Sequence, residues 1–271
     1  MKVCICGTIK NVAEHISGVI KNMEKIGSLF EDYIILLYYD HSSDNTLNIV
    51  KNHQKQNPKI QLYVNKNPLT KFRTHNIAKG RNFCLYTIRK YYSNYEYFIM
   101  MDCDDVCSGN MNIDILKNYL SVPETWDALS FNREEYYDIW GLSIPPYVMS
   151  VRHFHNIEKA EEKARKFIKE SLGKLKDHQL LRCFSAFNGF SIYKTQKFIN
   201  CVYNGSLRLD LIPLKMRKIN EKILNDKFKI NFNNNANEDT IYEDCEHRSF
   251  HLQAIKKNNV KICISPQILF S

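Results

Sequence analysis

The 271-residue sequence lacks the signals of a membrane protein or a secreted one. No segment approaches the eighteen or so consecutive apolar residues that a transmembrane helix needs. The N-terminus also lacks the charged region and following apolar region of a secretory signal. We therefore expect no transmembrane segment and a cytoplasmic location.

Paired cysteine motifs are also missing. The nine cysteines are scattered and odd in number, and no Cys-x-x-Cys pair is present, which argues against a zinc ribbon and a thioredoxin-like motif. Cys4, Cys6 and Cys263 lie in apolar runs. We expect reduced thiols that pack as small core residues.

The charge balance is basic, with 38 Lys and Arg against 29 Asp and Glu and a formal net charge of +9. Such a surface favours anions, which include nucleic acid, an anionic membrane and nucleotide phosphates. The chain has no Arg-rich tract and no helix-turn-helix or zinc-finger spacing. We therefore expect no nucleic-acid partner.

Short apolar runs alternate with helical spacing over the first hundred residues. This order predicts right-handed crossover units and a parallel sheet. With no internal repeat or long linker, residues 1–271 are expected to form one large α/β domain, with a mostly parallel, Rossmann-like sheet flanked by helices. This domain could also be the N-terminal part of a longer protein. The first strands are expected over Lys2–Ile9, Ile34–Tyr39, Ile60–Val64 and Tyr97–Met101.

The second half is less regular. Ile157–Leu172 is strongly charged and is expected to be a solvated helix. A further helix is expected over Asp239–Lys256, and strands are expected over Trp126–Phe131, Phe184–Tyr193 and Val260–Ile264.

Three carboxylates follow the strand that ends at Met101, namely Asp102, Asp104 and Asp105. In open α/β sheets, ligands bind outside the carboxyl ends of the strands. Crowded carboxylates repel one another unless a cation lies among them, and such hard oxygen ligands suit Mg²⁺ or Mn²⁺. A solvated loop is the alternative for an isolated Asp-x-Asp.

Asp244, His247 and His251 are spaced three and four residues apart, so on a helix they share one face. Such a face could bind a metal or supply a base beside one. A zinc hydrolase is an alternative, although His-Glu-x-x-His and a third soft ligand are missing. A second alternative is a solvent-exposed helix face on which the histidines have hydrogen-bond partners and no catalytic role.

Two further features could contact a ligand. Asn188-Gly189 interrupts an apolar strand, which indicates either close approach of the backbone to a ligand or a bulge. Trp140, near Asp138, could stack on a sugar ring or pack in the core.

Four motifs in order resemble the glycosyltransferases of the GT-A fold, especially those of the family 2 type. They are Asp40-His41-Ser42-Ser43-Asp44-Asn45-Thr46, Gly80-Arg81-Asn82, Asp102-Cys103-Asp104-Asp105 and Glu243-Asp244. His41 replaces the usual Gly of the first motif. The segments Tyr136–Trp140, Phe187–Phe190 and Cys245–His247 are also similar to a branch found in large DNA viruses and in capsule-type mannosyltransferases. A viral member would work in the host cytoplasm.

The resemblance implies a role for each matched region. Residues 1–105 would form the nucleotide-sugar-binding half and residues 106–271 the acceptor-binding half. The donor would contact Gly7, Thr8, Asp40, Arg73, Arg81, Asp102 and Cys103. Asp104, with His251 or His247, would hold Mn²⁺ or Mg²⁺. Asp244 or Glu243 would deprotonate the acceptor, and Asp138, Trp140, Asn188 and Gly189 would bind it.

The implied reaction is a metal-dependent transfer of a sugar from a nucleoside-diphosphate sugar, with UDP favoured, to a hydroxyl of a glycan or glycoprotein. A base opposite the leaving group predicts inversion at the anomeric carbon. One alternative is a nucleotide- or glycan-binding module without turnover. Another is a sugar-phosphate nucleotidyltransferase, which usually has a Gly-rich loop where this chain has only Gly7.

Overall fold

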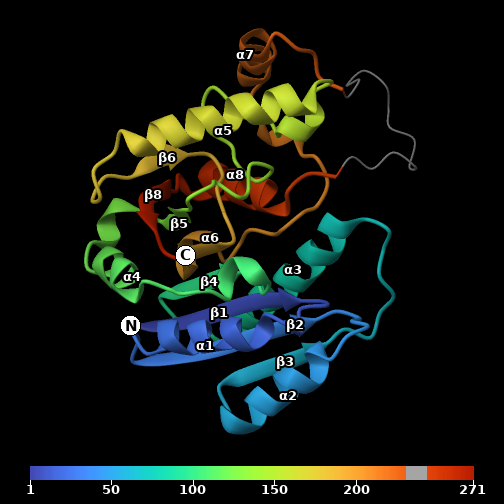
Figure 1. Cartoon of the computed structure of the whole chain (residues 1–271), viewed down its shortest axis with the longest axis vertical. Coiled ribbons are helices and arrows are strands. Elements are labelled where there is room, and N and C mark those ends of the chain that lie inside the picture. The colour runs from blue at the N-terminus through green and yellow to red at the C-terminus, as the bar shows by residue number, and fades with distance from the viewer. Residues whose placement is uncertain (230–242) are drawn as a thin grey trace.

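The computed structural model describes residues 1–229 and 243–271. They form a single α/β domain around one mixed, mostly parallel sheet of eight strands, in the order β3-β2-β1-β4-β7-β5-β8-β6 (Figure 1). This confirms the predicted fold class. The strands are β1 (Lys2–Ile9), β2 (Asp32–Tyr39), β3 (Ile60–Val64), β4 (Tyr97–Met101), β5 (Ala128–Asn132), β6 (Leu181–Cys183), β7 (Phe190–Lys194) and β8 (Ile262–Ile268).

The first four strands are parallel, with β1 paired to both β2 and β4. β7 then inserts antiparallel between β4 and β5. β5 and β8 are parallel to each other, and β6 closes the edge antiparallel to β8. The second half of the chain therefore continues the sheet of the first half.

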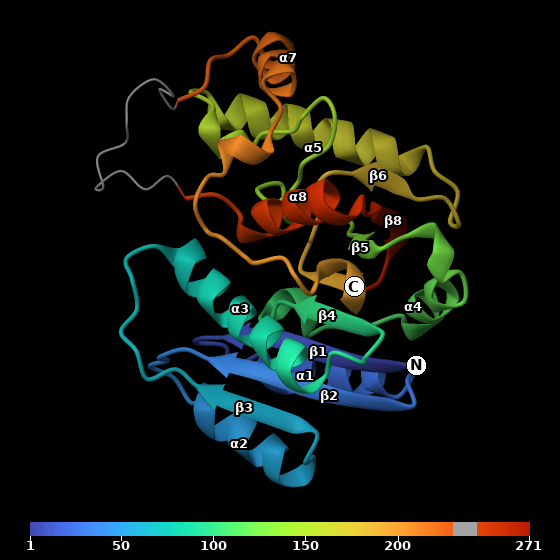
Figure 2. The same ribbon diagram turned by 180° about the vertical axis from the view of Figure 1, so that it is seen from behind.

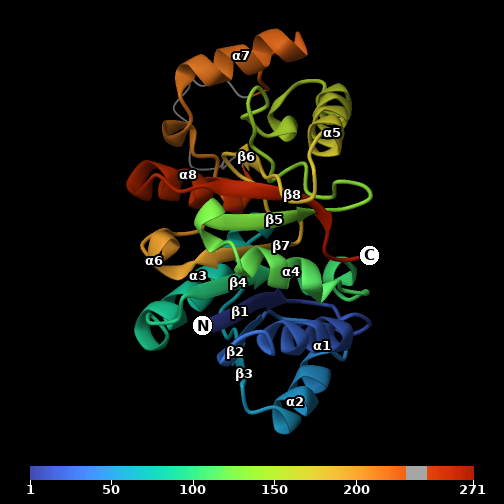
Figure 3. The ribbon, with the colours of Figure 1, turned by 90° about the vertical axis from the view of Figure 1, so that its left-hand side faces the viewer.

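Helices cover both faces of the sheet (Figure 3). Alternate side chains of a strand point to opposite faces, so Val3 and Ile5 join one core while Cys4 and Cys6 join the other. The helices are α1 (Ile16–Gly27), α2 (Thr46–Gln56), α3 (Arg73–Tyr91), α4 (Ile113–Leu120), α5 (Ile157–Gly173), α6 (Thr195–Phe198), α7 (Leu214–Leu224) and α8 (Glu246–Asn258).

All nine cysteines are buried and none forms a disulfide, in agreement with the expectation that they pack as small core residues. None of the described helices is long and apolar enough to cross a membrane.

α5 is not the solvated helix that its charges predicted. Ala160, Ala164, Ile168 and Leu172 recur every four residues and are buried. This stripe makes the helix amphipathic, and it packs against the core beside β8 and α7. Figures 1 and 2 show α5 crossing the β6 end of the molecule, far from α2.

Two other predicted elements begin later than expected. Asn188 and Gly189 have φ values of 54° and 86°, which a strand does not tolerate, so β7 begins only at Phe190. α8 begins at Glu246, so Asp244 precedes the helix and does not share its face with the two histidines. Residues 239–242 of that predicted helix lie outside the described part of the chain.

Candidate active site

A cavity of about 560 Å³ lies at the carboxyl ends of β1, β2 and β4, and we call it the α3 cavity. Because parallel strands end at one edge, residues far apart in the sequence meet there. Its lining includes Thr8, Asp40, Arg73, Arg81, Asp102, Cys103 and Asp104. Gly7 does not line it. A Cβ at Gly7 would lie 2.3 Å from the Cys103 sulfur, so glycine lets β1 pack against the turn after β4.

Asp40 is fixed by a neighbour that the sequence did not single out. Its buried carboxylate accepts a hydrogen bond of 2.7 Å from the side-chain amide of Asn65, which follows β3. Nearby, the Asp44 carboxylate accepts from the backbone N–H groups of Ala13 and Thr46. These bonds join the loops after β1, β2 and β3 to one another.

Arg81 joins three elements from within α3. Its guanidinium is buried, donates to the Asp102 carboxylate at 2.9 Å, and contacts Glu246 and His247 at the start of α8. The group also lies 4.6 Å from the centre of the Phe187 ring. Burial acts to lower the pKa of Arg81, but Glu246 and Asp102 outweigh it and the pKa is raised.

The carboxylates after β4 are crowded and poorly solvated. Burial raises the pKa of Asp102 to about 7; Arg81 opposes this rise, and Asp104 and Asp138 add to it. Burial also raises the pKa of Asp104, whose carboxylate accepts from the Val106 N–H at 3.2 Å. These groups therefore favour a bound proton or cation.

Two smaller cavities continue from the α3 cavity. The central pocket, of about 80 Å³, shares Arg73, Arg81 and Asp102 with it and adds Asp138 and Trp140. The Trp140 cavity, of about 400 Å³, shares Asp138, Trp140 and Arg73 with the central pocket. Asp138 therefore lies between the acidic cluster and the second half of the chain.

Asn188 holds the loop that carries Asp138. Its side-chain oxygen accepts from the N–H groups of Tyr137 and Asp138 at 2.9 and 3.0 Å, and its amide donates to the Phe131 carbonyl at 2.8 Å. Only 2% of Asn188 is exposed. In this structure its side chain contacts the protein's own backbone.

Gly189 acts on the acidic cluster. Its carbonyl accepts from the Asp102 N–H at 2.8 Å, and a Cβ at this position would lie 2.5 Å from Val106. Together with its positive φ, this close approach requires glycine.

The Asp138 carboxylate accepts from the Gly141 N–H at 2.7 Å. Burial raises the pKa of Asp138, and Glu246 adds to the rise. A poorly solvated carboxylate with a raised pKa, lining a cavity, is suited to proton transfer.

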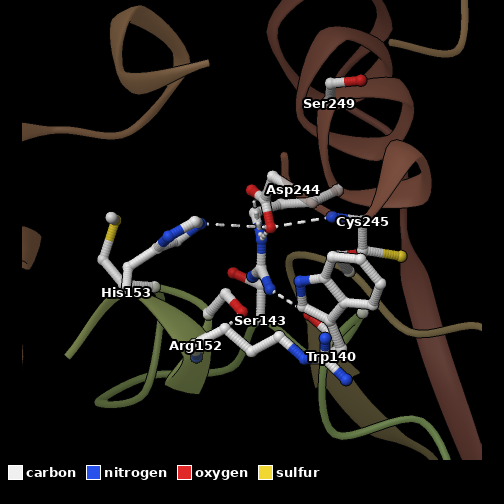
Figure 4. A network of polar contacts seen from close by, with 12 residues as sticks. Trp140, Ser143, Arg152, His153, Asp244, Cys245 and Ser249 are labelled. Atoms are coloured by element: carbon white, nitrogen blue, oxygen red, sulfur yellow. Dashed lines mark hydrogen bonds and ion pairs between the residues drawn. The ribbon is translucent and has the colours of Figure 1, made fainter. Parts of the chain in front are cut away.

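Asp244 lies in a buried ion pair (Figure 4). Its carboxylate is 3.0 Å from the Arg248 Nε and 3.6 Å from the His153 ring, and 2% of the residue is exposed. It lines none of the three cavities described above. Burial works to raise the pKa of Asp244, but Arg248 and His153 outweigh it and the pKa is lowered.

Arg248 extends this pair to the loop before α5. Its guanidinium donates to the carbonyls of Leu142 and Val148 at 2.9 and 3.0 Å, and to that of Trp140. The Arg152 guanidinium lies 4.2 Å from the centre of the Trp140 ring. Sequence reasoning missed Arg248, although its i,i+4 spacing from Asp244 is typical of an ion pair.

The two histidines are buried away from solvent. The ring nitrogens of His251 lie 3.0 Å from the hydroxyls of Ser185 and Tyr193. Burial, Arg248 and Arg81 lower the pKa of His251 to about 3. His247 stacks on Phe187, and burial and Arg81 lower its pKa as well. His247 lines the central pocket, and His251 does not line the α3 cavity where Asp104 lies.

Glu243 lines the Trp140 cavity and accepts from the backbone N–H and hydroxyl of Thr74 at 2.9 and 2.8 Å. Among residues 1–229 and 243–271, no group of three or more His, Cys, Asp or Glu side chains could hold a metal alone.

No family model and no curated protein matches the chain. Among solved structures, TarS 1–349 from S. aureus in complex with UDP-GlcNAc aligns with a TM-score of 0.50 at 12% identity, over 100% of this chain and 57% of that one. TarS from S. aureus also aligns with a TM-score of 0.45 at 13% identity, over 84% and 34%. The mannosyltransferase PcManGT from Pyrobaculum calidifontis, in complex with GDP-Man and Mn²⁺, aligns with a TM-score of 0.40 at 14% identity, over 72% and 45%.

The chain therefore spans a little over half the length of the first of these structures. At 12% identity the likeness shows a shared fold, and that fold is GT-A-like.

Proposed function

We propose that this chain is a glycosyltransferase that moves a sugar from a nucleoside-diphosphate sugar to an acceptor hydroxyl. The observation that supports it most is the convergence of Asp40, Arg73, Arg81, Asp102 and Asp104 on the α3 cavity. This cavity lies beside β1, whose neighbours β2 and β4 are reached by crossovers in opposite directions. Such a switch point is where open α/β sheets bind nucleotides.

We place the donor in the α3 cavity in one direction. Asp40 would accept from the nucleotide base, Arg73 would contact the diphosphate, and Asp102, held by Arg81, would lie near the ribose or sugar. Guanidinium and phosphate groups pair strongly through charge-assisted hydrogen bonds. The fold shared with a protein solved with UDP-GlcNAc supports a UDP-sugar.

The acidic cluster fits Mn²⁺ or Mg²⁺. Asp104, beside Asp102, would hold the ion together with the diphosphate oxygens, a donor set in which one or two carboxylates suffice. The raised pKa of both carboxyls indicates charge that a cation would relieve. When bound, the ion would stabilise the negative charge of the departing nucleoside diphosphate. We leave His251 out of this ligand set because its ring nitrogens face Ser185 and Tyr193.

We assign the base to Asp138 in place of Asp244 or Glu243. Asp138 lines the central pocket between the acidic cluster and the Trp140 cavity, whereas Asp244 is paired with Arg248 and Glu243 with Thr74. The acceptor oxygen would form a bond to the anomeric carbon while the bond between that carbon and the diphosphate oxygen breaks. Asp138 would take the proton of the acceptor hydroxyl. This single displacement inverts the anomeric centre.

A hydroxyl of a glycan or glycoprotein would enter through the Trp140 cavity. The indole N–H of Trp140 is buried and has no hydrogen-bond partner among the described residues. Buried donors are normally satisfied, so we expect this N–H to gain an oxygen partner when the acceptor binds and the side chains around it adjust. The narrower likeness to transferases of large DNA viruses stays a prediction from the sequence.

A thermal-shift panel of UDP-, GDP- and CMP-sugars, with and without Mn²⁺, tests the donor site. A ligand at about a hundred times its Kd stabilises the folded state by roughly 2.7 kcal/mol. We expect one nucleotide class to raise the midpoint only with metal, and Asp104→Asn to lose the shift. No shift with any nucleotide would overturn the donor site. Binding without transfer or hydrolysis would favour a binding module, and nucleotide exchange with a sugar phosphate would favour a nucleotidyltransferase.

Asp138→Asn tests the base. We expect the donor-induced thermal shift to persist while kcat falls by about 10²–10⁴. Because the active form is the carboxylate, kcat of the unaltered protein should fall as the pH drops below the raised pKa of Asp138. Near-normal turnover by Asp138→Asn would refute this role.

A further inference from the structure

A fourth cavity, of about 790 Å³, lies beyond the Trp140 cavity, and we call it the α5 cavity. Its walls come from the segment after β5, from one face of α5 and from the end of β8. Its lining includes Glu134, Glu135, Tyr137, Lys166, Lys169 and Gly173.

The four cavities follow one another along the molecule. Tyr137 and Arg165 line both the α5 cavity and the Trp140 cavity. The Trp140 cavity then leads past Asp138 into the central pocket, which adjoins the α3 cavity through Arg81 and Asp102. A ligand whose reacting hydroxyl lies at Asp138 can therefore extend toward α5.

The space beyond Asp138 exceeds what one sugar ring needs. The Trp140 and α5 cavities together provide far more than the roughly 300 Å³ at which small-ligand pockets begin. Tyr137, which is 44% exposed, lines three of the cavities and therefore lies where they meet.

The charges of the α5 cavity indicate the class of ligand. Lys166 and Lys169 lie one turn apart on α5 and form no hydrogen bond or ion pair with residues 1–229 or 243–271. Glu134, Glu135 and Asp177 are exposed and line the same cavity. Arg133 and Arg165 also line it, but Arg133 donates to the carbonyls of Val106 and Asn188, and Arg165 pairs with Glu161. A hydroxyl both donates and accepts, so it suits a lining with ammonium donors and carboxylate acceptors, whereas the two glutamates would repel a polyanion.

We propose that the α5 cavity binds the distal units of an extended, hydroxyl-rich acceptor, a glycan chain of several sugar units whose terminal hydroxyl reaches Asp138. This inference rests on the proposed function, because the chain is the acceptor of that reaction. It defines the substrate class as a chain and makes a free monosaccharide a poor acceptor.

Gly173, the last residue of α5, allows the cavity to be blocked. A Cβ there meets no atom within 4 Å, and all nine native cysteines are buried, so Gly173→Cys supplies a thiol that a maleimide-polyethylene glycol reagent labels selectively. The matched control is Asn52→Cys with the same label, on the exposed side of α2.

The assay uses pairs of acceptors, each pair made of a monosaccharide glycoside and an oligosaccharide of the same sugar. The turnover of the two members is compared, and their binding is measured on a printed glycan array. We expect kcat/KM for the chain to exceed that for the monosaccharide by about tenfold or more, which corresponds to roughly 1.4 kcal/mol of binding. Labelling Gly173→Cys should remove this difference and leave the monosaccharide rate and the donor-induced thermal shift unchanged. Labelled Asn52→Cys should behave like the unlabelled protein.

Equal use of chain and monosaccharide, or an unchanged chain preference after labelling, would overturn the inference. So would the failure of every glycan to bind to the array. Loss of the donor-induced shift in the unlabelled protein would instead refute the proposed function, and the array would still test the cavity.

Discussion

Replacing Asp244 by Asn tests whether this residue holds a loop in place or takes part in the chemistry. The side chain keeps its shape but loses the charge that faces Arg248 at 3.0 Å. Arg248 is 1% exposed, so its guanidinium would remain buried without a counterion. The loop that this guanidinium holds through the Trp140, Leu142 and Val148 carbonyls should therefore loosen.

Removing one partner of a buried ion pair costs about 3–5 kcal/mol. Domains have about 5–15 kcal/mol of stability in total, so the loss is a large fraction. With an m-value of about 3 kcal/mol/M, the urea midpoint should fall by roughly 1 M or more. The pKa of Asp244 in the folded protein lies below the usual 3.8, so its carboxylate stabilises the fold above that pH. This stabilisation is lost as the pH falls through the folded pKa. The difference in stability between the unaltered protein and Asp244→Asn should therefore become smaller in acid.

Urea titration followed by tryptophan fluorescence measures this effect, and kcat is compared at a temperature where both proteins are folded. Asp244→Leu combined with Arg248→Met should recover part of the loss, because neither charge is then left unpaired. We expect a less stable protein with a modest loss of kcat. An unchanged urea midpoint together with a thousandfold lower kcat would show that Asp244 acts in the chemistry and that the base is not Asp138.

Two further predictions concern the site's charges and its packing. Because the pKa of Asp102 is raised from 3.8 to about 7, the folded protein binds a proton more readily than the unfolded chain, so the thermal midpoint without nucleotide should fall as the pH rises from about 4 to 7. Asp102→Asn should flatten this dependence, and an equally steep slope in the variant would contradict the assignment. Gly205→Ala should destabilise the protein by about 1–3 kcal/mol, because its Cβ would lie 2.6 Å from the Thr74 backbone, which cannot yield as a side chain could. Gly173→Ala is the matched control, with no atom within 4 Å, and should be neutral or stabilising by up to about 1 kcal/mol.

The sequence by itself determined the first half of the fold and the acidic edge. Apolar runs that stop at Asp40 and Asp102 end strands of one parallel sheet, so these carboxylates had to meet at the same edge. The four spaced motifs also predicted the GT-A-like fold. The apolar runs and the motifs are local signals, because each can be recognised from residues a few positions apart. The common direction of parallel strands then places the ends of the runs at one edge of the sheet.

Only the tertiary structure decided which carboxylate lies in the cavity and which is paired. β7 inserts between β4 and β5, and this pairing brings Asn188 and the Asp138 loop to the acidic cluster. Arg248 finds its carbonyl partners about a hundred residues earlier in the chain. Strand order and partners at such separations depend on the packing of the whole chain. The resemblance implied Asp244 or Glu243 as the base, from their place in a motif. The partners of these carboxylates, Arg248 for Asp244 and Thr74 for Glu243, and the place of Asp138 at the central pocket come from the tertiary structure.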